Sequence, residues 1–207
     1  MKRAGLVAGM LALLASCTGN AEERSVPLPS TSPSASTSPL PPLSSVARAA
    51  RIGPHAFVRT CESSVYGELS RQTVETNSVR AGPLYLIGLP GYAHARASEF
   101  RRPNGRLNAV KVLAVARRAA TLSIAPADRP HASLIYDPHR FSAGRVERGD
   151  YRVTFQVCHP PPDRYGTQFN GGFLVDGVRC IALNVAWDGG AHHRRILASF
   201  GAGNCLG

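Results

Sequence analysis

Cysteines are the residues of this chain best suited to chemistry, and four of its five, Cys61, Cys158, Cys180 and Cys205, follow residue 53, where apolar residues begin to alternate. Zinc sites take Cys or His ligands at close spacing, such as two cysteines separated by two residues, and no such pair occurs. The adjacent pair His192-His193 would point to opposite faces of a strand, which makes chelation awkward. We therefore predict no metal site and no cofactor, and we interpret the four cysteines as two disulfides.

The pairing of these cysteines can be estimated from strand faces. Cys158 ends one predicted strand and Cys180 lies within another, and both avoid the stronger apolar face of their strand. If the two strands are neighbours, Cys158 and Cys180 form one bridge, and elimination pairs Cys61 with Cys205. Four cysteines allow three connectivities, so this pairing is a hypothesis about strand order.

Patterns for covalent or acid-base catalysis are weak. The sequence has no Gly-x-Ser-x-Gly motif, and the carboxylates of Asp137, before Pro138, and Asp150, after Gly149, are typical of turns. Ser63, His131 and Asp137 are residue types of a hydrolytic triad, but a chain of this length contains such residues by chance. No catalytic residue is predicted.

One local cluster has the composition of a ligand-binding loop. Tyr165, Gln168, Phe169 and Asn170 offer aromatic rings and amides within six residues, and such groups suit sugar polymers and peptides. The structural interpretation is that Phe169 fills the core and Asn170 adopts a positive φ before Gly171-Gly172. We favour the structural interpretation, and we keep the four residues as the candidate binding loop.

The N-terminal residues have the pattern of an export signal. Lys2-Arg3 is followed by an apolar stretch, residues 4–15, that is too short for a stable membrane span. Leu14-Ala15-Ser16-Cys17 resembles a bacterial lipoprotein signal, with a large aliphatic residue three places before the cysteine. The resemblance implies cleavage after Ser16 and a diacylglyceryl group on Cys17, and two acyl chains suffice for stable attachment. An ordinary secretory signal with an incidental Cys17 is the alternative.

Composition divides the rest of the chain into two parts. Residues 17–52 are rich in serine and proline with few large apolar residues, so they cannot form a core, and we predict a disordered, semi-stiff linker. We therefore expect a signal peptide over residues 1–16, a lipid-anchored linker over 17–52 and one folded domain over 53–207.

The chain is basic, with a formal charge of +11, and Lys2 and Lys111 are its only lysines. The arginine doublets are Arg101-Arg102, Arg117-Arg118 and Arg194-Arg195, and no aromatic residues interleave with them as a base-stacking surface requires. We interpret the excess of arginine as a compositional bias and predict no specific nucleic-acid binding. Contact of a basic face with anionic lipids or wall polymers stays open.

Short alternating segments separated by Gly, Pro and Asp predict an all-β fold. The expected strands are residues 56–60, 83–88, 110–116, 121–125, 132–136, 151–157, 173–175, 178–187 and 195–200. Asp176-Gly177 suits a type I′ turn, so 173–175 and 178–187 should form a hairpin. Many short strands with close turns indicate an Ig-like β-sandwich of about seven to nine strands. A partly open barrel is the alternative.

Several motifs together resemble a family of actinobacterial exported lipoproteins with no established activity. They are the lipoprotein signal, the Ser/Pro linker, the four cysteines, Ala81-Gly82-Pro83, Lys111-Val112-Leu113-Ala114-Val115, Thr167-Gln168-Phe169-Asn170-Gly171-Gly172-Phe173 and Ser199-Phe200-Gly201-Ala202-Gly203-Asn204-Cys205. The resemblance extends from about Cys61 onward. It implies an exported protein and brings no reaction or ligand.

We therefore expect a lipid-anchored protein on the extracytoplasmic face of the cell membrane. Its partners would be the membrane, through the anchor, and an envelope protein or glycan held by a binding or interaction module. An envelope hydrolase acting on cell-wall or lipid substrates is the alternative function, and a structural spacer without a ligand is the third. A cleft with a titratable pair would favour the enzyme, and an exposed patch would favour the binding module.

Overall fold

The computed structural model describes residues 51–142, 144–159 and 164–205. The predicted signal peptide, the lipidation residue Cys17 and nearly all of the linker lie outside these residues. The strands are β1 (Arg51–Gly53), β2 (Ala56–Arg59), β3 (Ser78–Ala81), β4 (Leu84–Ile87), β5 (Ala109–Lys111), β6 (Leu113–Ala116), β7 (Ala120–Ile124), β8 (Ala132–Leu134), β9 (Arg152–Phe155), β10 (Thr167–Phe169), β11 (Gly172–Val175), β12 (Arg179–Trp187) and β13 (His192–Phe200).

Short helical segments connect the strands. The α-helices are α1 (Arg71–Thr76) and α2 (Ala97–Phe100), and the 3₁₀ turns are η1 (Cys61–Ser63), η2 (Leu89–Tyr92), η3 (Pro126–Asp128), η4 (Pro138–Arg140), η5 (Val146–Arg148) and η6 (Asp188–Gly190). In the described part of the chain, no helix is long and apolar enough to cross a bilayer.

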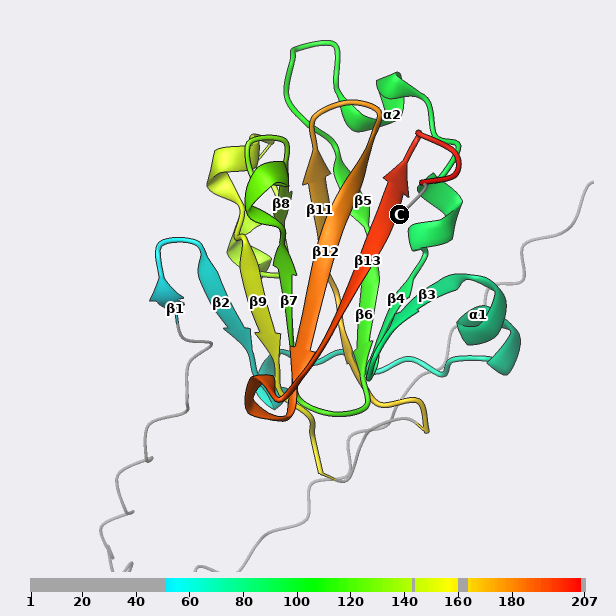
Figure 1. Ribbon diagram of the computed structural model, residues 1–207, viewed down its shortest axis with the longest axis vertical. Helices are drawn as coiled ribbons and strands as arrows, with labels where there is room; N and C mark the ends of the chain where they lie inside the picture. The colour runs from blue at the N-terminus through cyan, green and yellow to red at the C-terminus, as the bar shows by residue number, and fades with distance from the viewer. Residues whose placement is uncertain (1–50, 143, 160–163, 206–207) are drawn as a thin grey trace, which may run out of the picture. The chain divides into compact units, whose positions relative to one another are not determined.

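The strands form a two-layer β-sandwich (Figure 1). The first layer is one six-stranded sheet in the order β1-β2-β9-β7-β12-β13. The second layer has a four-stranded part, β10-β6-β4-β3, and a three-stranded part, β5-β11-β8. These parts continue one ladder, since Phe169 pairs with Ala114 and Gly172 pairs with Lys111 in the same register. The predicted all-β sandwich with two disulfides is confirmed.

All nine predicted strands are present. The described residues form more strands than were predicted, for two reasons. The segment predicted as 110–116 is divided into β5 and β6 at Val112, and β1, β3 and β10 were not predicted. Each of these three has only three or four residues, and β3, Ser78–Ala81, lacks the apolar alternation by which strands are recognised.

The core lies between the layers and follows the predicted alternation. Ile181, Leu183 and Val185 of β12 are fully buried, as are Val153 and Phe155 of β9. Burying one such side chain stabilises the fold by about 1.5–3 kcal/mol. The polar residues between them on β12 and β9 face outward, which fixes the strand register.

The predicted hairpin at Asp176-Gly177 is wrong. β11 pairs with β5 and β8 in the second layer, whereas β12 pairs with β7 and β13 in the first, so the turn carries the chain between layers. A type I′ turn needs positive φ at both central residues, and here Gly177 has a φ of +82° while Asp176 does not enter that region. All four residues of β11 are buried, which suits a strand covered on both faces.

Both disulfides form, but with a different pairing from the one predicted. Cys61 pairs with Cys158, and Cys180 pairs with Cys205, with Cα–Cα distances of 5.4 and 5.8 Å. The prediction failed because β7 lies between the strands that carry Cys158 and Cys180, and antiparallel pairing with β7 places these cysteines at opposite ends of the sheet.

Strand direction explains the observed pairs. β2 and β9 are parallel neighbours, so Cys61 and Cys158, which follow them, emerge at the same end. β12 and β13 are antiparallel, and Cys180 near the start of β12 therefore meets Cys205 beyond the end of β13. With sequence separations of 97 and 25 residues, the chain-entropy model gives stabilisations of about 4.7 and about 3.5 kcal/mol.

Strand β2 ends at a buried arginine, Arg59, whose guanidinium is hydrogen-bonded within the fold. Arg59 is only 2% exposed, and its guanidinium donates to the carbonyl of Tyr136, at 2.6 Å, and to the carbonyl of Ser63. Burial lowers the pKa of Arg59 to about 10, and the charge of Asp137 opposes this shift. The guanidinium also lies 5.4 Å from the ring centroid of Phe169. Arg59 thus ties strand β2 to the chain after β8.

A second arginine nearby bridges two buried carboxylates. The Nε of Arg140 lies 3.7 Å from Asp137, and its Nη1 lies 3.5 Å from Asp150. The same Nη1 donates to the carbonyls of Arg148 and Gly149. Asp137 and Asp150 are 4% and 0% exposed, so these carboxylates are embedded in a structural network.

Candidate functional site

The structure does not present the candidate binding loop as a unit. Phe169 is fully buried, with its ring centroid 5.3 Å from that of Phe155 in the core. Gln168 is 2% exposed, and its amide nitrogen donates to the carbonyl of Gly67 at 2.5 Å. Tyr165 is half-buried against an apolar cluster that contains Val115. Gln168 and Phe169 are therefore structural, because neither can reach a ligand in solution.

Asn170 is exposed, and its backbone differs from the prediction. Its φ is not positive, so the following glycines are not explained by a left-handed turn at Asn170. Gly171 is required by packing instead, since a Cβ there would lie 2.1 Å from the ring of Tyr136. The Tyr136 ring crosses Gly171 to donate from its hydroxyl to the carbonyl of Val112, at 3.1 Å.

A different set of residues gathers on the side of the sandwich where the layers end at β3 and β13. A cavity of about 810 Å³ there is lined by Arg80, Arg194 and Arg195 together with the apolar side chains of Val79 and Ile196. A second cavity of about 390 Å³ is lined by Arg80, Gly82, Pro83, Arg117, Arg118 and Trp187. Arg80 lines both cavities, so they adjoin. We call the five arginines, Arg80, Arg117, Arg118, Arg194 and Arg195, with Trp187, the arginine groove.

Three separate elements bring these arginines together. Arg80 lies on β3, which is the edge strand of the second layer. Arg117 and Arg118 form the turn that carries the chain from β6 to β7. Arg194 and Arg195 lie on β13, the edge strand of the first layer, and are exposed. The groove therefore depends on the alignment of the two edges.

The electrostatics of the groove are strongly positive. Arg118 forms an exposed ion pair with Asp188 at 3.3 Å, and Arg80 donates to the carbonyl of Gly82 at 3.3 Å. Within the described ranges, the guanidinium groups of Arg117, Arg194 and Arg195 have no hydrogen-bond or ion-pair partner. No Asp or Glu is among the described residues that line either cavity. These guanidiniums are available to an anionic ligand, which they can bind through two donors each.

Trp187, the only tryptophan of the chain, closes one end of the groove. Its ring stacks on His192 with centroids 5.5 Å apart and an interplanar angle of 20°. The same ring packs on Gly82, whose φ is +60° and where a Cβ would lie 2.6 Å from the indole. Glycine is therefore required at position 82 for two reasons: the turn between β3 and β4 needs a positive φ there, and the indole of Trp187 leaves no room for a Cβ.

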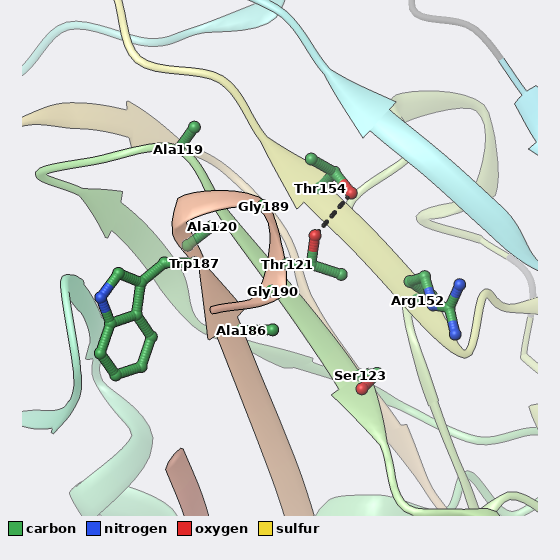
Figure 2. A pocket seen from close by; sticks show the side chains of 10 residues that line it. All are labelled: Ala119, Ala120, Thr121, Ser123, Arg152, Thr154, Ala186, Trp187, Gly189 and Gly190. Atoms are coloured by element: carbon green, nitrogen blue, oxygen red, sulfur yellow. Dashed lines mark hydrogen bonds between the residues drawn. The ribbon is translucent and has the colours of Figure 1, made fainter. Parts of the chain in front are cut away.

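Trp187 also borders a shallow hydroxyl-rich cavity on the outer face of the first layer. Figure 2 shows Thr121 and Thr154 with their hydroxyls toward each other, 2.9 Å apart, while the indole of Trp187 points away from them. The cavity has a volume of about 470 Å³, and Ser123 and Arg152 also line it. Its hydroxyl pair is internally hydrogen-bonded, so it offers a ligand fewer free groups than the arginine groove does.

Sequence reasoning missed the arginine groove although its parts were visible. Two of the three arginine doublets, Arg117-Arg118 and Arg194-Arg195, lie in it, but they are far apart in the sequence. Only Arg194-Arg195 lies close to Trp187 in the sequence, and Arg117-Arg118 comes near it through the pairing of β7 with β12. Arg80 gave no signal, because its strand was not predicted.

No metal centre accompanies these sites in the described residues, where no group of three or more His, Cys, Asp or Glu side chains could hold an ion. Comparison with protein-family models, with curated proteins and with solved structures found no match. Function is therefore inferred from the residues and the geometry of the groove.

Proposed function

We propose that this protein is an extracytoplasmic binding module, lipid-anchored through Cys17 at the cell membrane, which holds an anionic envelope polymer or an acidic envelope protein in the arginine groove. The observation that carries the proposal is the convergence of five arginines from three elements on one side of the sandwich. Cys17 lies outside the described residues, and the anchor rests on the resemblance of Leu14-Ala15-Ser16-Cys17 to a lipoprotein signal. The two disulfides agree with an oxidising compartment.

The chemistry of the groove favours an extended ligand with repeated negative charges. Arginines line both of the adjoining cavities that form the groove. Several anionic groups of one ligand polymer can therefore be bound along it. Ile196 and Leu197 add apolar surface along the channel. Trp187 at the end offers an aromatic edge to a sugar ring or an apolar side chain.

The alternative function, an envelope hydrolase, has less support. Acid-base or nucleophilic catalysis needs a titratable or nucleophilic side chain that faces a cavity. In the described part of the chain, the linings of five cavities include serine and threonine hydroxyls but no Asp, Glu or His that could act on them as a general base, and the lining cysteine, Cys205, is in a disulfide. No observation at the groove calls for a reaction.

The proposal is tested by binding of defined polyanions to the full-length chain. Inorganic polyphosphate and poly-L-glutamate serve as probes, with the fluorescence of Trp187 and titration calorimetry as readouts. The double variant Arg194→Glu/Arg195→Glu should weaken binding of at least one probe by about tenfold or more, because two donors are replaced by repelling charges. Its thermal unfolding should stay near that of the wild type, since both side chains are exposed.

A matched control separates the groove from net charge. The variant Arg145→Glu/Arg148→Glu makes the same change in charge at two exposed residues in and beside η5. It should keep binding within about twofold of the wild type. Equal loss in both variants would show that only net charge matters, and failure of the wild type to bind either polyanion would refute the groove as a polyanion site.

A further inference from the structure

The outer face of the second layer is covered at two places and open between them. Side chains at alternate positions of β5 and β6 point to this face. One small apolar cluster, which includes Ile135 and Leu174, covers the β5 end, and another, which includes Val74 and Ile87, covers the β6 end. Lys111 lies between the two clusters and is exposed.

The open strip is hollowed into a cavity of about 730 Å³, which we call the outer pocket. Its apolar wall combines Ile135 from one cluster with Ile87 and Leu113 from the other, and Phe141 completes it. Phe141 is 39% exposed, which is unusual for a phenylalanine. The volume lies within the range of about 300–1,000 Å³ that is typical of small-molecule sites, which are mostly apolar with a few polar groups.

The polar groups of the outer pocket are positively charged or neutral. Arg102 donates from Nε to the side-chain oxygen of Asn108, at 2.9 Å, and this bond leaves its terminal nitrogens without a partner among the described residues. The ammonium of Lys111 likewise has no partner in that part of the chain. No carboxylate belongs to the described lining, and Asn170 adds an amide. The pocket is therefore complementary to one anionic group beside an apolar chain.

We propose that the outer pocket binds a single-chain amphiphile with an anionic head group, either a fatty-acid carboxylate or an alkyl phosphate monoester. The alkyl chain lies against Ile87, Leu113 and Phe141, where each buried CH₂ contributes about 0.8 kcal/mol. The head group is bound by Lys111 and Arg102 through charge-assisted hydrogen bonds. This site does not depend on the arginine groove, which lies between the edges of the two layers and shares no lining residue with it.

The test compares ligands that share one chain and differ in the head group. Palmitate, hexadecyl phosphate and hexadecyltrimethylammonium are titrated, each below its micelle concentration, into the full-length chain in detergent-free buffer. The two anions should bind at least about tenfold more tightly than the cation. The tighter of the two anions identifies the source, a free fatty acid or a phosphate-bearing lipid.

Variants separate the head-group contact from the apolar contact. Lys111→Glu and Asn170→Asp each add negative charge at an exposed position. Both should lower the affinity for the two anions by about tenfold without lowering the affinity for the cation. Phe141→Ala should lower the affinity for all three ligands by about threefold or more. Arg194→Glu, in the arginine groove, is the matched control and should leave palmitate binding unchanged.

Three results would overturn the proposal. They are no binding of either anion at about 0.1 mM, equal binding of anion and cation, and anion binding that persists unchanged in both Lys111→Glu and Asn170→Asp. Because the control variant acts only on the groove, loss of polyanion binding with retained palmitate binding would separate the two sites.

Discussion

The same side chain has opposite surroundings in two regions of the molecule: Arg59 and Arg140 belong to hydrogen-bonded networks within the fold, whereas the groove arginines are exposed. The terminal nitrogens of Arg59 and Arg140 are bound by carbonyls and carboxylates of the fold. Arg117, Arg194 and Arg195, by contrast, are exposed and have no acceptor in the described part of the chain. The formal charge of +11 counts both kinds equally. We therefore propose a role in binding for the arginines that the fold leaves unpaired and a role in stability for those that it pairs.

The largest expected effect is on stability, from Arg59→Met. Removing this guanidinium leaves the carbonyls of Tyr136 and Ser63 without their donor and takes from Asp137 one of its nearby positive charges, the other being Arg140. We expect the free energy of unfolding to fall by about 3–5 kcal/mol, measured by urea denaturation. The exposed counterpart Arg195→Met should change it by less than about 0.5 kcal/mol. Similar losses in the two variants would remove the distinction between the two sets.

A smaller effect is expected at alkaline pH from Tyr136, whose carbonyl oxygen accepts a hydrogen bond from Arg59. Burial raises the pKa of the Tyr136 hydroxyl above its ordinary value near 10. The folded state therefore keeps a proton that the unfolded chain releases, so the free energy of unfolding falls as the pH rises above about 10. The lowered pKa of Arg59 acts in the opposite sense, because there the unfolded state binds the extra proton.

The variant Tyr136→Phe isolates the contribution of the phenol. Urea denaturation at about pH 8 and about pH 11 should show a smaller alkaline loss of stability in the variant than in the wild type. An equal alkaline loss in both proteins would mean that the buried hydroxyl does not titrate with unfolding.

The smallest effect is expected for Arg71→Ala, which removes an exposed ion pair outside both sets. Arg71 and Glu75 lie one turn apart on α1, with a distance of 2.7 Å and side chains that are 78% and 57% exposed. Solvent screens an exposed pair of this kind, so the free energy of unfolding should not change measurably. Polyanion affinity should stay within about twofold of the wild type. A larger effect on binding would extend the functional surface to α1.

The fold class could be predicted because its signals are local. The alternation of Ile181, Leu183 and Val185 is visible in the sequence, and β12 follows it. The disulfide pairing could not be predicted, because it depends on the insertion of β7 between β9 and β12, a pairing between residues distant in the sequence.

The candidate site was less predictable than the fold for the same reason. Phe169 belongs to a residue type that is common in binding loops. Its pairing with Ala114, however, places its ring on the side of the strand that faces the core. Arg80 is unremarkable in the sequence and Arg194 is visible there only as part of a doublet, and the alignment of two edge strands is what brings them together. A local pattern therefore predicts which residues form strands better than it predicts what those strands expose.

The two disulfides also define how the domain would carry a mechanical load. A pull on the N-terminal side of β1 can peel away β1 and β2 only as far as Cys61, where the covalent link passes the tension to Cys158. From there the load follows the backbone to Cys180 and crosses to Cys205. Residues 62–157 and 181–204 are bypassed by the tension, so most of the sandwich, including β3, β5, β6 and β13, would keep its length under a force that stretches its ends, whereas β10 and β11 lie on the loaded path.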